Sequence, residues 1–244
     1  MKKEHFVPGW IRQKKDHRDH QYKARAIKVP SSFKSANIGA VKDQGQLGSC
    51  TGHGGTTATE IVSKKEGKTI VLSPMYLYWF TRFLEGTTST DAGAEVRDVF
   101  KAGKQFGIAP ETAWSYLIRQ FKTRPSKTAC LAALVFKDLQ YEAVAQDINI
   151  IKNAIVTNEN VIIGFDVYDN FFDIGMDGTM PAPAGNLAGG HCVCIYGYDD
   201  VRNAVLCRNS WGDAWGQNGD FWMPYSYLLS QHAADFWTVS LVGK

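Results

Sequence analysis

Hydrophobic residues recur at helical spacing in the first part of the chain and form short apolar runs in the last part. The helical pattern predicts helices over residues 50–65, 74–84, 95–106 and 146–157. The later runs are typical of strands, which are expected over residues 161–167, 191–198, 204–208, 221–223 and 236–241. Because the helices precede the strands, the chain is expected to fold as an α+β protein with two lobes.

Capping residues mark two of the expected helices. Ser73 followed by Pro74 is typical of a helix start, because the serine oxygen can accept a free N–H and proline fits the first turn. Asp91 is predicted to cap the helix over residues 95–106, and Gly107 is predicted to end it.

The first 28 residues differ in composition from the rest of the chain. They hold nine lysines and arginines against three acidic residues, with few aliphatic side chains, so they cannot build a core of their own. The chain is therefore divided into an N-terminal extension, residues 1–28, and a domain over residues 29–244.

The extension nevertheless contains an apolar stretch, Val-Pro-Gly-Trp-Ile, at residues 7–11. This stretch is too apolar for a free tail. It favours an arm docked on the domain, with Phe6, Trp10 and Ile11 in a hydrophobic groove. A short strap that is later trimmed and a disordered basic tail are the alternatives.

The composition narrows the possible partners. The 244 residues are 44% hydrophobic and 21% charged, which is enough for a full core. A net charge of +3 gives no reason to expect nucleic acid as a partner. No apolar run is long enough to span a bilayer, and the N-terminus lacks the apolar region of a signal peptide, so neither a membrane partner nor secretion is indicated.

The five cysteines do not form a recognisable disulfide framework. Cys192 and Cys194 lie two residues apart in a predicted strand, so they project to the same face and are not expected to bridge. A chain without disulfides is compatible with the reducing cytosol. A signal peptide already removed from the sequence is the alternative, which leaves the compartment open.

Three short segments supply the groups that acyl transfer by a thiol requires. Residues 44–50 read Gln-Gly-Gln-Leu-Gly-Ser-Cys, residues 189–191 read Gly-Gly-His, and residues 209–212 read Asn-Ser-Trp-Gly. They contribute a thiol, an imidazole and an amide, which can act as nucleophile, proton carrier and orienting group. The thiol of Cys50 lies at a predicted helix start, where the helix dipole lowers the pKa of a thiol.

These segments resemble the papain-like cysteine proteases. Gln44 stands six residues before Cys50, and Asn209 opens the sequence Asn-Ser-Trp-Gly-x-x-Trp-Gly-x-x-Gly-x-Phe. His191 and Asn209 follow Cys50 by 141 and 159 residues, close to the spacing of this family. The resemblance runs from about Val29 to the C-terminus. Gly-Trp-Ile at residues 9–11, Arg-Asp at 18–19 and Asp-Phe-Trp-Thr at 235–238 are similar to a branch found in bacteria and some viruses.

The resemblance implies a two-lobed fold with an active-site cleft between the lobes. A helical lobe over about residues 40–138 would carry the cysteine, and a β-barrel-like lobe over about residues 139–244 would carry the histidine and asparagine. It also implies a cysteine endopeptidase that needs no metal and no cofactor. The partners would then be polypeptide substrates and protein inhibitors.

The resemblance also assigns the catalytic roles. Cys50 would be the nucleophile and His191 the general base that later protonates the leaving amine. Asn209 would orient the imidazole, with Trp211 lying over that contact. Gln44 would donate to the oxyanion together with the backbone N–H of Cys50.

His53 is the alternative base, because it lies three residues after Cys50 on the same predicted helix. It is expected to point into its own lobe rather than across the cleft. Two departures from the family pattern are Thr51, in place of a tryptophan, and Leu47, where secreted members carry a disulfide-bonded cysteine. Neither removes a catalytic group.

Substrate binding is expected at two places. Gly93 and Ala94 resemble the family's glycine segment, where a peptide pairs its backbone with the enzyme as an added strand. Gly164 and Cys192 match positions that line a substrate pocket. This pocket takes the residue that precedes the one whose carbonyl is attacked. Trp211 would border the site. Because both pocket residues are small, a roomy apolar pocket that favours Leu, Phe or Tyr is expected. Plain core packing is the alternative for both.

Two other functions share these features in part. A transpeptidase or amidase with a narrow substrate would use the same chemistry with another acceptor. A silent papain-like binding protein would need none of the four catalytic groups together, so their joint presence argues against it. Removal of residues 1–28 is expected to lower stability, and to raise activity if the arm covers the cleft.

Overall fold

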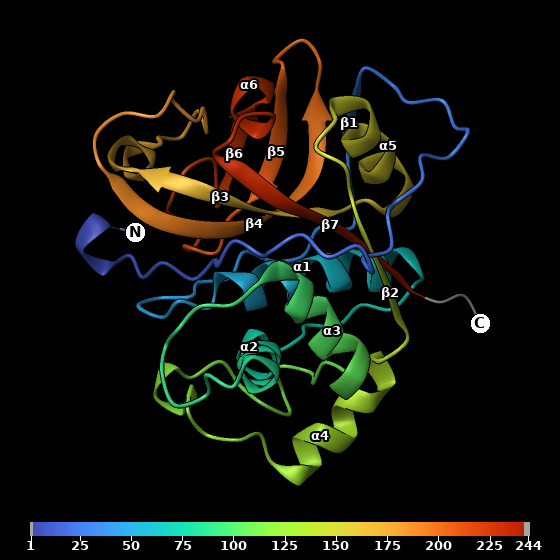
Figure 1. Ribbon diagram of the computed structural model, residues 1–244, viewed down its shortest axis with the longest axis vertical. Coiled ribbons are helices and arrows are strands. Elements are labelled where there is room, and N and C mark those ends of the chain that lie inside the picture. Colours follow the sequence, from blue (N-terminus) through green and yellow to red (C-terminus); the bar gives the residue numbers. More distant parts are fainter. Residues whose placement is uncertain (1, 242–244) are drawn as a thin grey trace.

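The computed structural model describes residues 2–241 and shows a sheet-rich lobe above a helical lobe, with α1 between them (Figure 1). The helices are α1 (Cys50–Lys65), α2 (Pro74–Glu85), α3 (Val96–Phe106), α4 (Lys127–Ala133), α5 (Ile148–Asn158) and α6 (Tyr225–Leu228), with short 3-10 turns at Lys3–His5, Ile118–Gln120, Leu134–Phe136 and Asp169–Asp173. The strands are β1 (Ser32–Lys34), β2 (Leu139–Ala143), β3 (Val161–Tyr168), β4 (Leu187–Asp199), β5 (Ala204–Arg208), β6 (Asp220–Pro224) and β7 (Ala233–Leu241).

The expected α+β architecture is confirmed, and the pattern located most elements within a few residues. It missed β1, β2, α4 and α6, which are short. No helix in the part of the chain that the structure describes has both the length and the apolar character needed to cross a membrane.

The helix α1 is the central element, and its first 14 residues are all buried. A helix buried on every side needs small residues where its neighbours approach. At Gly52 a Cβ atom would lie 2.8 Å from the Pro74 carbonyl oxygen at the start of α2, and at Gly55 it would overlap the side chain of Val99 in α3. These two glycines therefore let α2 and α3 pack directly on α1.

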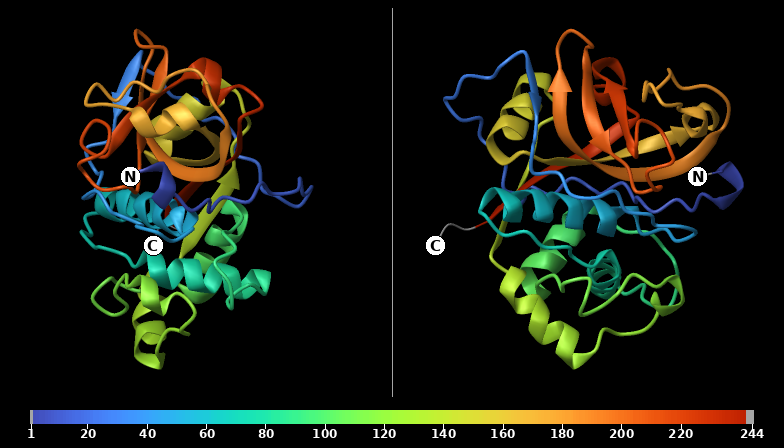
Figure 2. Two further views of the ribbon diagram at one scale, coloured as in Figure 1. Left: turned by 90° about the vertical axis from the view of Figure 1, so that its left-hand side faces the viewer. Right: turned by 180° about the vertical axis from the view of Figure 1, so that it is seen from behind.

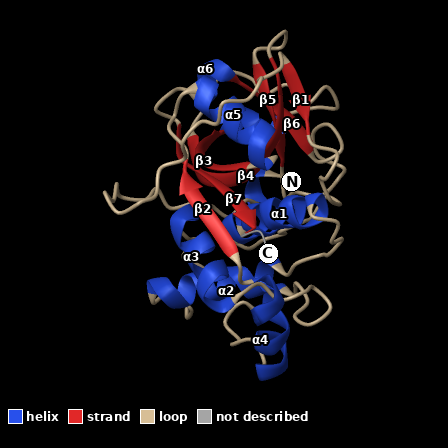
Figure 3. Cartoon of the chain, turned by 90° about the vertical axis from the view of Figure 1, so that its right-hand side faces the viewer, coloured by secondary structure: helices blue, strands red, loops and turns tan. Residues whose placement is uncertain are grey.

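The seven strands form one antiparallel sheet in the order β2-β7-β3-β4-β5-β6, with β1 added beside β4. The long strand β4 bends as it runs under the lobe, and α5 and α6 lie around the sheet (Figures 1 and 3). Among residues 2–241 no pairing joins β6 to β2, so the barrel-like lobe is a curved open sheet. Because the first part of β4 contacts the N-terminal segment at Gly190 and packs against α1, the sheet carries His191 to the boundary between the lobes.

The two capping predictions had different outcomes. The Ser73 oxygen accepts the backbone N–H of Tyr76, so α2 begins as expected. Asp91 does not cap α3, which is preceded by Glu95 and begins at Val96. The Asp91 carboxylate is engaged elsewhere, as described below.

The N-terminal segment runs along the boundary between the two lobes (Figure 2). Near its end it joins the edge of the sheet at Ala143 of β2. The N–H of Ala143 donates to the His20 carbonyl at 2.7 Å, and the N–H of Tyr22 donates to the Ala143 carbonyl at 2.8 Å. Residues of the expected extension are thus docked on the domain over a long path.

Candidate active site

Cys50 is the first residue of α1, and its side chain is completely buried. It is covered by Gly9 of the N-terminal segment, where an added Cβ would lie 2.8 Å from the thiol sulfur. Burial raises the pKa of the Cys50 thiol to about 12, although the backbone N–H groups of Cys192 and Thr51 act in the opposite direction. The lowered pKa expected for this thiol is therefore wrong for the covered site, because the segment above it excludes water.

His191 and Asn209 are in direct contact at the boundary of the sheet lobe. The distance from His191 Nε2 to Asn209 Oδ1 is 2.7 Å, and the same oxygen accepts the N–H of Ser210 at 2.8 Å. Since Oδ1 accepts both bonds, Nε2 carries the proton and Nδ1 is left with a lone pair. Among residues 2–241, the buried Nδ1 has no hydrogen-bonding partner.

Trp211 lies beside this pair, as expected. Its ring centre is 4.8 Å from that of His191, with an interplanar angle of 35°. Phe6 of the N-terminal segment packs against both rings in T-shaped contacts, with centroid distances of 5.9 Å to His191 and 5.6 Å to Trp211. The imidazole is therefore fully buried, and burial lowers its pKa to about 4.

Gln44 is held rigidly next to the same pair, and its side chain is fully buried. Its amide oxygen accepts the Ser210 hydroxyl at 2.7 Å, and its amide nitrogen donates to the Leu47 carbonyl at 2.8 Å. The second bond fixes which end of the amide is the donor, because a backbone carbonyl can only accept. One N–H of Nε2 is used by Leu47, and the second makes no hydrogen bond within residues 2–241.

His53 lies away from the other groups, inside the helical lobe. Its Nδ1 is 3.0 Å from the Ser49 carbonyl oxygen, and its ring packs against Tyr116 with centroids 4.7 Å apart. Burial lowers its pKa to about 3, so it stays neutral. The geometry favours His191 over His53 as the proton carrier.

Asp91 ties the loop before Cys50 to the helical lobe. Its two oxygens accept the N–H of Gly48 at 2.9 Å and the hydroxyl of Tyr78 at 2.5 Å, and the same hydroxyl accepts the N–H of Gly93 at 3.1 Å. The network begins next to Leu47, the position where secreted members of the resembled family carry a disulfide-bonded cysteine. All five cysteines of this chain are free, so hydrogen bonds join these loops instead.

The N-terminal segment pairs with the cleft through its backbone. The N–H of Ala94 donates to the Gly9 carbonyl at 2.9 Å, and the Ala94 carbonyl accepts the N–H of Ile11 at 3.0 Å. On the opposite wall, the Gly190 carbonyl accepts the N–H of Gly9 at 3.1 Å. Ala94, rather than the neighbouring Gly93, therefore carries both backbone bonds of the expected peptide-binding segment.

Trp10 fills a pocket at the centre of this pairing and is only 7% exposed. A Cβ at Gly164 would overlap its indole, and a Cβ at Gly190 would lie 2.8 Å from its ring, so both positions must be glycine for the ring to fit. Cys192 is the cross-strand partner of Gly164, and its thiol packs against Gly54 of α1. The side chain of Ile11 was expected in the groove but is 41% exposed. At this position the segment contacts the domain through the backbone N–H of Ile11, which donates to the Ala94 carbonyl.

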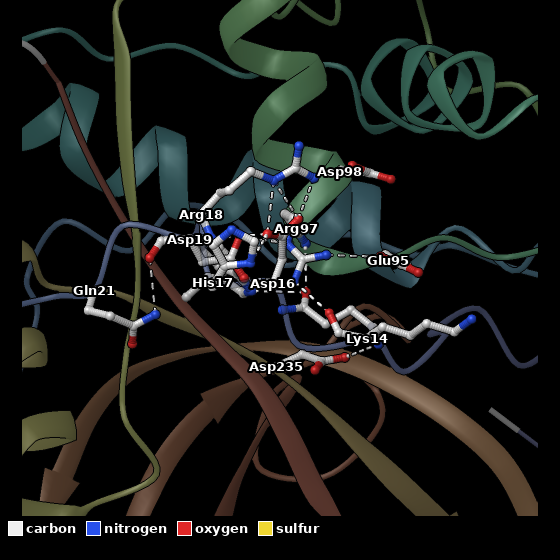
Figure 4. Close-up of polar contacts among 12 residues, drawn as sticks. Lys14, Asp16, His17, Arg18, Asp19, Gln21, Glu95, Arg97, Asp98 and Asp235 are labelled. Atoms are coloured by element: carbon white, nitrogen blue, oxygen red, sulfur yellow. Dashed lines mark hydrogen bonds and ion pairs between the residues drawn. The ribbon is translucent and has the colours of Figure 1, made fainter.

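The same segment is anchored beyond the cleft by Arg97 of α3 (Figure 4). The guanidinium binds both carboxylate oxygens of Asp19 at 2.8 and 2.7 Å and donates to the Lys14 carbonyl at 2.7 Å. Such a two-pronged contact fixes orientation as well as position. Residues 6–19 are thus held at both ends and across the cleft.

Sequence reasoning missed three positions that shape the site. Ser210 bonds to Gln44 and Asp91 bonds to Gly48, and both partners are distant in the chain. No local sequence pattern predicts such bonds. Asp235 closes the pocket of Trp10, and its backbone lies in the left-handed region with φ of 59°. The sequence marked Ser210 as part of the Asn-Ser-Trp-Gly motif, Asp91 as an expected helix cap and Asp235 as part of the segment typical of the branch, but it gave none of them its role in the site.

Comparisons with known proteins agree with this architecture. Residues 28–231 match the papain family of cysteine proteases. The chain is 32% identical over 215 residues to an uncharacterised peptidase C1-like protein of Acanthamoeba polyphaga mimivirus, covering 82% of this chain and 69% of that protein. It is 29% identical over 203 residues to vignain of Phaseolus vulgaris, covering 80% of this chain but only 54% of vignain, so it spans about half of that enzyme.

A solved structure is similar over nearly the whole chain. Xylellain, a cysteine protease from Xylella fastidiosa, superposes with a TM-score of 0.89 at 30% identity, covering 97% of this chain and 96% of that one. The similarity includes the region N-terminal to the family match. The chain therefore belongs to the papain family of cysteine proteases and, with these viral and bacterial relatives, to the branch that the sequence indicated.

Proposed function

We propose that the protein is a cysteine endopeptidase that works through Cys50, His191 and Asn209, with Gln44 as oxyanion donor. The observation that carries this proposal is that the His191 imidazole and the Gln44 amide are both buried and are both held by hydrogen bonds to the adjacent residues Asn209 and Ser210. The imidazole is oriented by Asn209 at 2.7 Å, and the Gln44 amide is oriented by Ser210 at 2.7 Å. A structural core would not need both side chains held in this way.

The proposed reaction proceeds in two steps. His191 takes the proton of the Cys50 thiol, and the thiolate attacks the substrate carbonyl carbon. The oxyanion is stabilised by the Gln44 amide and the Cys50 backbone N–H. The C–N bond then breaks as His191 protonates the leaving amine, which gives an acyl-enzyme. Water, deprotonated by His191, hydrolyses the thioester and restores the thiol.

We also propose that the docked segment, residues 6–19, keeps this peptidase inhibited. Gly9 covers the thiol and Phe6 covers the imidazole, so a substrate cannot reach either group. The Gly9 carbonyl oxygen accepts the N–H of Ala94 and is thus directed away from an oxyanion donor. This arrangement explains how a peptide can lie against a nucleophile without being presented for attack.

A labelling and cleavage experiment tests the peptidase proposal. The full chain, with the segment weakened by Trp10→Ala, should react with iodoacetamide at Cys50 and should cleave casein. An added amine nucleophile should leave the products unchanged, whereas capture of the amine would indicate a transpeptidase. Absence of both labelling and cleavage would favour a silent binding protein.

The role of Gln44 gives a prediction for catalysis. Gln44→Ala should lower kcat by about 100- to 1000-fold with little change in KM, because its second N–H contacts mainly the developing oxyanion. Ser210→Ala, which only releases the orientation of that amide, should have a smaller effect. Steady-state kinetics on a fluorogenic peptide, with both changes made in the chain that carries Trp10→Ala, measure both. A raised KM at normal kcat would show that Gln44 binds the ground state.

The role of Asp91 gives a prediction for the loop that carries the nucleophile. Asp91→Asn should lower the melting temperature, because the amide cannot accept both the Gly48 N–H and the Tyr78 hydroxyl as a carboxylate does; we expect about 1–3 kcal/mol. Tyr78→Phe removes the hydroxyl that donates to Asp91 and also leaves the buried Gly93 N–H without its acceptor, so it should lower the melting temperature as well. Equal melting temperatures for Asp91→Asn and the unchanged protein would contradict this role.

A further inference from the structure

The pocket of Trp10 ends in a carboxylate. The indole N–H donates to Asp235 Oδ2 at 2.8 Å, and the backbone N–H of Gln13 donates to the same oxygen at 2.9 Å. Both donors belong to the docked segment. Asp235 itself belongs to β7 of the domain, so it remains when the segment leaves.

The backbone holds Asp235 in an unusual conformation. Ile162 of β3 pairs with Trp237 of β7, whereas Gly164 pairs with Ala234, so β7 contains one more residue than β3 over this stretch. This is a β-bulge, a feature that redirects a side chain and that is frequent next to active sites. Asp235 lies within it at φ of 59°, a conformation that costs energy in any residue other than glycine and persists where the surroundings impose it.

The shape of the pocket indicates the size of its occupant. Its walls include Gly164 and Gly190, and it holds a complete indole with little exposure. A long side chain therefore fits between the entrance and Asp235. The apolar pocket expected from Gly164 and Cys192 is thus only partly right, because its far end is ionisable.

The charges around Asp235 depend on the docked segment. Burial raises the pKa of this carboxyl, while the Gln13 and Trp10 hydrogen bonds and the positive charge of Arg12 act against burial. All three stabilising groups leave with the segment, and Arg97 of α3 is the domain cation that still acts on Asp235. A half-buried carboxylate that loses its donors is left unsatisfied, which is costly.

We propose that this pocket, once vacated, selects peptide substrates whose side chain brings N–H donors to Asp235, with arginine preferred. This inference rests on the proposed peptidase function. A guanidinium reaches a carboxylate with two parallel bonds and stays charged, while its methylene stem can pack on the glycine-lined walls. Leucine or phenylalanine would fill the same space but would leave Asp235 without a donor.

The first test uses the segment itself as the ligand and requires no turnover. Trp10→Arg and Trp10→Met in the full chain place unbranched, flexible stems in the pocket, the first with N–H donors and the second without. Labelling of Cys50 by iodoacetamide at pH 7 reports how often the segment leaves. The methionine variant should be labelled at least about 10-fold faster than the arginine variant, and adding Asp235→Asn should abolish this difference. Equal labelling of the two variants with Asp235 intact would overturn the proposal.

The second test uses substrates on the full chain carrying Trp10→Ala. Two fluorogenic peptides differ at one position, which is arginine in the first and leucine in the second. This position is the residue that precedes the one whose carbonyl is attacked. The arginine peptide should have a kcat/KM about 10- to 100-fold higher, and Asp235→Asn should remove this preference. Glu95→Gln is the matched control, because Glu95 is a neighbouring acid that contacts Arg97 at 3.7 Å and should leave the preference intact.

The outcomes separate the two proposals. Cleavage of both peptides with a leucine preference that ignores Asp235→Asn would refute the pocket assignment and leave the peptidase function standing. If Glu95→Gln removed the arginine preference as completely as Asp235→Asn, the pocket assignment would also be refuted. The preference would then come from the overall negative charge of the region and not from a contact with Asp235. Labelling of Cys50 without cleavage of any peptide would refute the peptidase function, and the labelling test would still decide the pocket.

Discussion

Replacement of Cys50 by alanine is expected to abolish peptide hydrolysis, with a loss of at least about 10⁴-fold in kcat, as for other enzymes that lose their nucleophile. The side chain is fully buried at the first residue of α1, and alanine is a good helix former, so the fold should be retained. The change is best made in the full chain carrying Trp10→Ala, where the cleft is open. Cleavage of casein and of a fluorogenic peptide are the measurements.

Cys130→Ala is the matched control for this prediction. Cys130 is a free thiol on α4, in the helical lobe, and it contacts none of the groups at the cleft described above. It should leave activity unchanged. Comparable cleavage by the Cys50→Ala variant, with an intact far-ultraviolet circular dichroism spectrum, would show that the nucleophile is another group.

The contact between His191 and Asn209 could be anticipated because the relevant signals are local. His191 follows two glycines at the start of an apolar run, and Asn209 opens a motif of 13 residues. His191 lies in β4 and Asn209 directly follows β5. Because β4 pairs with β5, the two side chains are brought together. The helix after Cys50 was equally readable, since its pattern spans four turns.

The features that escaped prediction depend on contacts between distant parts of the chain. The left-handed conformation of Asp235 results from the register between β3 and β7, which no local pattern encodes. Asp91 was expected to cap α3 because only its distance to that helix was visible, whereas its oxygens face Gly48 and Tyr78. The pKa of Cys50 was expected to fall because the helix start was visible, whereas the sequence did not tell that the docked arm places Gly9 over the thiol.

Trp10→Ala in the full chain is expected to uncover the site. The Trp10 indole is only 7% exposed, so its removal should weaken docking of the segment by about 3–5 kcal/mol. If the undocked fraction is small in the unchanged protein, this loss increases that fraction by a factor of about 100 or more. Labelling of Cys50 by iodoacetamide at pH 7 should accelerate accordingly. The melting temperature should fall by several degrees, because the docked segment no longer stabilises the domain.

A second variant makes this prediction independent of the pocket. Gly9→Val leaves the indole unchanged, but a Cβ at this position would overlap the Gly48 carbonyl and crowd the Cys50 thiol, so the segment cannot seat. Lys15→Ala, at an exposed position of the same segment, is the control and should leave labelling slow. Because Gly9→Val and Trp10→Ala remove docking by a clash and by a cavity respectively, acceleration in both would mean that the segment itself controls access. Unchanged labelling and melting in both variants would mean that residues 6–19 do not govern access to Cys50 in solution.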